Sequence, residues 1–129
     1  MSGITRRFAD EGEGFVIGSN IITNPTTLTS NSDNLTITGI EEAYLVYLTS
    51  STNVKVYGID SSLITNTQQF IFVNNNTNGK KIKFENHNNS SSLPQNRFEM
   101  SHHVDLRPGD MVAFIYSQVR QRWLTFHYH

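Results

Sequence analysis

β-Strand patterns fill the stretch from Ile71 to Trp123, whose sequence is IFVNNNTNGKKIKFENHNNSSSLPQNRFEMSHHVDLRPGDMVAFIYSQVRQRW. The Asn- and Gly-rich segment 74–79 predicts a hairpin turn, and the alternating run Lys81–Glu85 predicts the strand after it. Arg107–Asp110 predicts a tight turn, because its Pro presets φ and its Gly accepts a positive φ. The apolar run Met111–Tyr116 and residues 122–126 then predict a final hairpin.

Further strands are predicted upstream of this stretch. Tyr44–Leu48 is apolar throughout, which is typical of a central strand covered on both faces, and Gln69–Val73 predicts another buried strand. Leu35–Thr38 and Val54–Tyr57 alternate, as strands with one wet face do. The strands are short and fairly evenly spaced, with turn residues between them and no internal repeat. We therefore predict an all-β fold, an antiparallel β-sandwich of jelly-roll-like form, over residues 31–129.

Residues 1–30 have a different character. Arg6 and Arg7 precede an acidic patch from Asp10 to Glu13, and no long alternation follows. We interpret this segment as an N-terminal arm that becomes ordered against a partner.

Composition narrows the classes of partner. The formal net charge is −1 and the chain contains no cysteine. We therefore expect no disulfide, no thiolate metal site and no general attraction to nucleic acid. No apolar run reaches the length that crosses a bilayer, so we expect no membrane insertion. Lys80, Lys81 and Lys83 cluster, but alternation places the last two on a solvated strand face with Ile82 and Phe84 opposite.

The chain offers no recognisable catalytic motif. We find neither a Gly-x-Ser-x-Gly nucleophile nor a phosphate-binding glycine loop. Glu41 and Glu42 are adjacent and would point to opposite faces of a strand. An isomerase or dioxygenase that used clustered histidines would need two imidazoles and a carboxylate converging on one cavity, and the spacing does not provide them. We predict that the protein is not an enzyme and has no cofactor.

The histidines are the only candidate metal ligands. His127 and His129 are two residues apart at the end of the chain and would share a face of a strand. One pair is too few for a tight site, so we predict no metal site within one chain. Three pairs around a threefold axis could hold an octahedral transition metal, which keeps this alternative open.

A polar loop is the candidate binding site. Residues 86–95 are too polar for a core and long enough to suggest a binding role. Arg97 is expected to anchor this loop through backbone carbonyls, and Trp123 is expected in the core, with an exposed sugar-stacking role as the alternative. The candidate binding residues are Asn86, His87, Asn88, Asn89, Ser90 and Gln95.

The order of these motifs over residues 71–123 resembles a β-structured domain of virion proteins from tailed bacteriophages, found in tail fibres, spikes and head fibres. The matching features are the Asn-rich turn, a strand ending in Glu85-Asn86, Ser90–Ser92 before Asn96-Arg97-Phe98, Asp105–Asp110, and Arg122-Trp123. The resemblance implies a homotrimeric, non-enzymatic component located in the virion. The terminal histidine pair is similar to pairs that bind iron in trimeric phage fibres and spikes.

Two functions follow as predictions. The first is a structural virion protein, a short trimeric fibre, spike or capsid-surface decoration in which residues 1–30 bind other virion proteins. The chain lacks a stalk repeat, which argues against a long fibre. A host-surface glycan is a further candidate partner. The alternative is a carbohydrate-binding β-sandwich module, because Asn, Ser and exposed Tyr are good partners for sugars.

Overall fold

The computed structural model describes residues 6–7, 16–23, 27–86 and 91–125, and its regular structure in these ranges is almost entirely β. It contains, in the described residues, no helix long and apolar enough to cross a membrane. Two 3-10 segments span Ile40–Glu42 and Pro94–Asn96. The strands are β1 (Arg6–Arg7), β2 (Val16–Ile17), β3 (Asn20–Ile22), β4 (Ala43–Leu48), β5 (Val54–Val56), β6 (Gln68–Asn74), β7 (Ile82–Phe84), β8 (Phe98–Glu99), β9 (Val104–Leu106), β10 (Met111–Ser117) and β11 (Arg122–Thr125).

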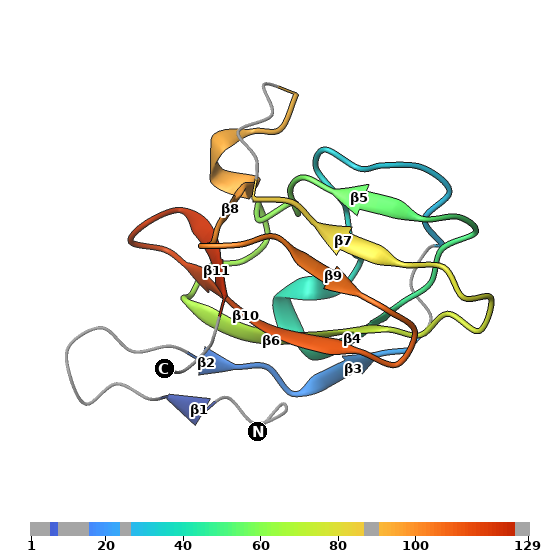
Figure 1. Ribbon diagram of the computed structural model, residues 1–129. Helices are drawn as coiled ribbons and strands as arrows, with labels where there is room; N and C mark the ends of the chain where they lie inside the picture. Colours follow the sequence, from blue (N-terminus) through green and yellow to red (C-terminus); the bar gives the residue numbers. More distant parts are fainter. Residues whose placement is uncertain (1–5, 8–15, 24–26, 87–90, 126–129) are drawn as a thin grey trace.

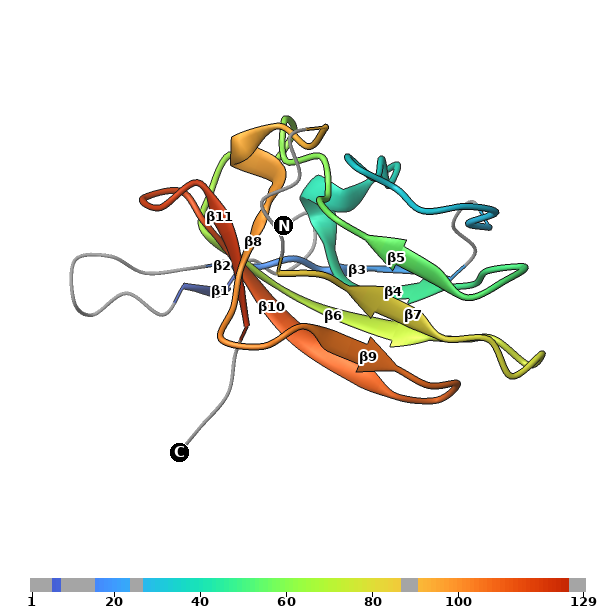
Figure 2. The same cartoon turned by 45° about the horizontal axis from the view of Figure 1, so that its top comes forward.

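The strands form two sheets that lie face to face. The larger sheet has eight strands and the smaller consists of β5, β7 and β9. Figure 1 shows the small sheet lying over β4, β6 and β10, and Figure 2 shows the same two layers from a tilted direction. The all-β prediction is confirmed.

The chain coils through these sheets as a short β-solenoid. It passes from β4 in the large sheet to β5 in the small one, returns to β6 and crosses again to β7. Successive coils pair in parallel: Ile21 lies beside Leu45, and Leu45 lies beside Ile71, in steps of 24 and 26 residues. In the small sheet Val54 lies beside Ile82, a step of 28 residues. Repeats of this kind contact mainly their neighbours.

The predicted antiparallel, jelly-roll-like sandwich is therefore wrong in its topology, although two layers are present. The error lies in the segment 74–79, which was expected to be a hairpin turn. It instead carries the chain from one sheet to the other, so that β6 and β7 have no pairing with each other. Turn composition reports where a chain bends and not which strands then pair.

An antiparallel cap closes the last coil. β9 pairs antiparallel with β7, and β10 pairs antiparallel with β6. The predicted final hairpin is confirmed as β10 and β11. The predicted turn at Arg107–Asp110 is also confirmed, because the Asp110 amide donates to the Arg107 carbonyl at 2.9 Å and Gly109 has a φ of 90°. This cap covers the edge that a fourth coil would otherwise occupy.

The first coil differs from prediction in two places. The predicted strand Leu35–Thr38 is absent and is replaced by a single bridge between Leu35 and Ile59, at a corner where the chain is turning. Part of the predicted arm belongs to the solenoid, since β2 and β3 pair with β6 and β4 and Leu28 joins the core. Within the segment before Val16, the described residues Arg6–Arg7 form β1, which pairs antiparallel with β2 at the edge of the large sheet.

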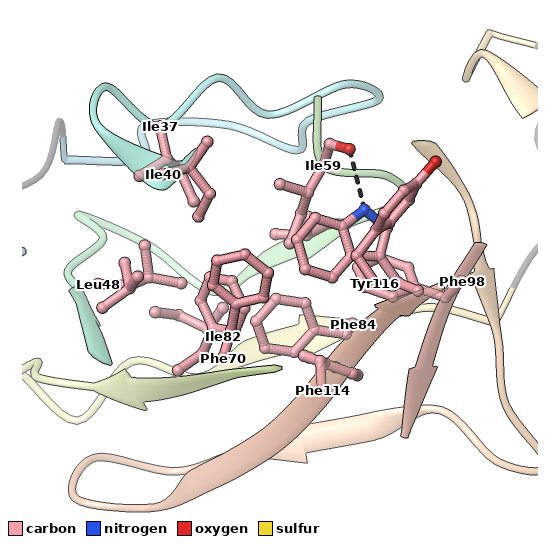
Figure 3. Packing of buried hydrophobic residues seen from close by; sticks show 14 of the residues in the cluster. Ile37, Ile40, Leu48, Ile59, Phe70, Ile82, Phe84, Phe98, Phe114 and Tyr116 are labelled. Atoms are coloured by element: carbon pink, nitrogen blue, oxygen red, sulfur yellow. Dashed lines mark hydrogen bonds between the residues drawn. The ribbon is translucent and has the colours of Figure 1, made fainter. Parts of the chain in front are cut away.

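The core between the sheets is aromatic (Figure 3). Phe72 lies 5.8 Å from Phe84 and 5.7 Å from Phe114 between ring centroids, so that the rings join the two layers. Trp123 is fully buried, as predicted, and its Nε1 donates to the Ile59 carbonyl at 3.0 Å. The sugar-stacking alternative for this tryptophan is thereby excluded.

Asparagine side chains close the coil corners where strand pairing ends. The Oδ1 of Asn31 accepts from the Lys55 amide, and that of Asn53 accepts from the Lys81 amide, each at 2.8 Å. Each bond joins one coil to the equivalent position of the next. Asn96 connects all three coils, because its Nδ2 donates to Asn34 and its Oδ1 accepts from the Ser61 amide. Backbone amides without ladder partners are satisfied in this way, in exposed positions at Lys55 and Lys81 and in a buried position at Ser61.

Asn74 is the sharpest test of this arrangement. Its side chain is fully buried, its Nδ2 donates to the carbonyls of Lys80 and Leu106, and its Oδ1 accepts from the Asn76 amide. We expect Asn74→Leu to lower the free energy of unfolding by about 2–4 kcal/mol, because buried polar groups lose their partners. Urea denaturation measures the change. The exposed control Asn66→Ala should stay within about 0.5 kcal/mol of wild type. Equal losses would contradict the assigned role.

Candidate functional site

The outer faces of the two sheets differ sharply in chemistry. Side chains alternate across each strand, so residues whose neighbours point into the core must point outward. Gln69, Ser117 and Arg122 also point outward, toward one end of the large sheet. The apolar outward residues of this sheet define what we call the apolar face. Its members are Ile17, Ile21, Leu45, Tyr47, Ile71, Val73, Met111, Ala113, Ile115 and Leu124.

The rows of the apolar face follow the strand register. One row runs across four strands as Ile21, Leu45, Ile71 and Ala113. Met111 is 62% exposed and Ile21 is 47% exposed, whereas most other members are half-buried. Charged groups lie at one edge of the sheet, where Arg120 pairs with Glu99 at 2.5 Å. An uncharged centre with a polar rim is typical of a protein–protein interface.

The outer face of the small sheet is polar and holds a shallow cleft. Lys55, Lys83 and Asp105 lie side by side on β5, β7 and β9. They belong to an open cavity of about 320 Å³, which we call the Asn/Lys cleft. Its lining residues are Asn31, Asn53, Val54, Lys55, Lys81, Lys83 and Asp105.

The cleft is cationic although the chain as a whole is slightly acidic. Three lysines and one aspartate line it, and the nearby Glu85 carboxylate pairs with Lys83 at 3.2 Å. The predicted solvated face is confirmed, because Lys81 is exposed while Ile82 and Phe84 are fully buried. Sequence alternation placed Lys81 and Lys83 outward. It did not place Lys55 beside them, since that contact depends on parallel stacking of β5 and β7.

The predicted binding loop is fixed at both ends. Asn86 forms two hydrogen bonds with the backbone of Met100, one from its Nδ2 and one to its Oδ1. Arg97 Nη2 donates to the Ser92 carbonyl at 2.8 Å, as predicted. At the far end, the Tyr116 hydroxyl donates to the Gln95 carbonyl at 2.7 Å. Gln95 itself is exposed, and the candidates His87, Asn88, Asn89 and Ser90 lie outside the described residues.

Only some of the histidines considered as metal ligands belong to the described residues. His127 and His129 lie outside the described residues. His102 and His103 are exposed and precede β9. In the part of the chain that the structure describes, no group of three or more histidine, aspartate or glutamate side chains is arranged to hold a metal ion.

We compared the chain with known protein families, curated proteins and solved structures. No family model, curated protein or solved structure matches the chain. The resemblance to phage fibre and spike domains over residues 71–123 therefore stays a prediction.

Burial raises the pKa of the Tyr116 phenol, and a hydrogen bond with Ser61 partly opposes this effect. The phenol therefore loses its proton at a lower pH in the unfolded chain than in the folded protein. As a result, the free energy of unfolding falls as pH rises above about 10. We expect Tyr116→Phe to lose about 1 kcal/mol at pH 7 and to show a shallower decline above pH 10. Urea denaturation at both pH values measures this. Gln95→Ala keeps the accepting carbonyl and should behave as wild type, and an unchanged slope in Tyr116→Phe would refute the assignment.

Proposed function

We propose that this protein is a structural component of a tailed-bacteriophage virion, assembled as a short homotrimeric fibre, spike or capsid-surface decoration. The observation that carries the proposal is the apolar face. β4, β6 and β10 present apolar residues on both sides, yet the core of one chain covers only one side. A sheet apolar on both faces is typical of strands that are covered on both faces.

The extent of the apolar face favours a stable association. It crosses β3, β4, β6, β10 and β11, which at ordinary strand spacing is roughly 20 Å wide and roughly 20 Å long. A continuous patch of that size reaches the upper range of what monomeric proteins leave exposed. Its burial would also supply stability that a small domain needs.

A second and third copy of the chain are the partners that fit this face. The members of the apolar face are uncharged. If a partner placed charged side chains against this face, those side chains would lose their hydration without gaining an ion pair. The same uncharged surface on another copy meets that condition, and closed symmetric homo-oligomers are the commonest assemblies of soluble proteins. The number three comes from the resemblance to phage fibres and spikes.

The remaining parts of the chain take roles that agree with this assembly. With the apolar faces turned inward, the polar outer face of the small sheet looks outward to solvent. Residues 1–15, of which β1 pairs with β2 at the edge of the large sheet, would serve as the attachment to other virion proteins. We propose a structural role without catalysis.

Two exposed members of the apolar face provide the test of association. We expect Met111→Glu combined with Ile21→Glu to convert the trimer to monomers at micromolar concentration, because burying unpaired carboxylates is costly. Size-exclusion chromatography with light scattering measures the mass. Circular dichroism should show an unchanged fold, since both side chains are exposed in one chain.

Leu63→Glu is the matched control, because Leu63 is 57% exposed but does not belong to the apolar face. This variant should remain trimeric. A wild-type protein that is monomeric at micromolar concentration would overturn the assembly, and so would equal dissociation of the control.

The attachment role predicts the outcome of a truncation. Removing residues 1–15 should leave a folded trimer, because the strands from β2 onward form the solenoid and the core. The truncated protein should no longer join the particle when it is mixed with virions that lack this component. Electron microscopy and immunoblotting of purified particles measure incorporation. Normal incorporation would refute the role of this segment.

A further inference from the structure

The Asn/Lys cleft places cations and amide donors beside one another on the outward face of the small sheet. Lys55 and Lys83 are neighbours across β5 and β7, and Lys81 lies one register step from Lys83 on the same side of the strand. Lysine ammonium groups that share a concave wall raise the local positive potential and attract anions. Asp105, and Glu85 through its ion pair with Lys83, reduce this charge without cancelling it.

Among the described residues, the side-chain amide of each cleft asparagine uses only its oxygen in a hydrogen bond. The Oδ1 atoms of Asn31 and Asn53 are used by the amides of Lys55 and Lys81, at 2.8 Å in both cases. These bonds fix the orientation of each side-chain amide and leave its NH₂ group as a donor. The cleft therefore combines cations, oriented neutral donors and one carboxylate acceptor.

That combination matches a particular kind of ligand. A carboxylate satisfies the lysines, and neighbouring hydroxyl groups can accept from the asparagines and donate to Asp105. Polyphosphate suits the cleft less well, because its closely spaced charges are repelled by Asp105 and it has no hydroxyl group to donate to that carboxylate. Nucleic acid would favour aromatic side chains for stacking, and the residues that line this cleft include none.

We propose that the Asn/Lys cleft binds an acidic polysaccharide that carries carboxylate groups, of the kind built from uronic acids. This inference rests on the proposed function in one respect, which is that a virion protein would use such a site to recognise the host surface. The physical argument concerns one subunit and does not need the trimer. In the assembly proposed above, three clefts would face outward and could engage one polymer together, which would strengthen weak individual contacts.

Oligogalacturonate provides the test probe, and its fully methyl-esterified form provides a neutral counterpart with the same sugar backbone. Isothermal titration calorimetry of the full chain should show binding of oligogalacturonate that weakens as salt increases. The neutral counterpart should bind at least tenfold more weakly. Light scattering on the same samples reports the oligomeric state, so a failure of the cleft and a failure of the assembly can be told apart.

Lys55→Gln combined with Lys81→Gln should weaken binding at least tenfold, whereas Lys80→Gln should change it less than twofold. Lys80 is the matched control because it adjoins Lys81 but does not line the cleft. Asp105→Asn should weaken oligogalacturonate binding and strengthen binding of inorganic polyphosphate. Absence of binding in wild type, an equal loss in Lys80→Gln, or tighter binding of polyphosphate or oligothymidylate to wild type would each overturn the inference.

Discussion

Side-chain amides at the coil corners hold this structure together, because a short solenoid has many backbone groups that its strands do not pair. Strands such as β5 and β7 contain only three residues each, so the sheets alone leave the corners unsatisfied. Asn31 and Asn53 accept from backbone amides one coil ahead, and Asn74 serves two carbonyls from inside the protein. A chain rich in asparagine thus uses that residue as a structural link as well as a turn former. The core then needs only to join two layers that are already aligned.

Local features of the fold could be predicted from the sequence. The tight turn at Arg107–Asp110, the final hairpin and the burial of Trp123 all follow from residue chemistry within a few positions. Arg97 was likewise expected to bind the carbonyls of the preceding loop, and it donates to Ser92. Pairing between coils could not be predicted, because partners lie 24 to 28 residues apart and share no repeated motif. Parallel pairing is harder to predict from sequence than a hairpin, because no short turn motif joins the two strands and fixes their register.

The same limit explains which functional residues were found. Alternation in Lys81–Glu85 predicted an outward-facing pair of lysines, which the structure confirms. Lys55, Asn31, Asn53 and Asp105 come from three other segments, and only coil stacking brings them to the Asn/Lys cleft. The apolar face left a clearer signal. The run Tyr44–Leu48 predicted cover on both sides, and the fold supplies that cover on one side only. The proposed assembly would cover the other side of this strand with residues from other copies of the chain.

The antiparallel cap has a consequence for length. β9 and β10 run against the direction of the coils and occupy the edges of β7 and β6. A further parallel strand from another molecule finds no vacant hydrogen-bonding edge on those two strands. Parallel stacking of the coils therefore ends at β6 and β7, and β9 becomes the outer strand of the small sheet.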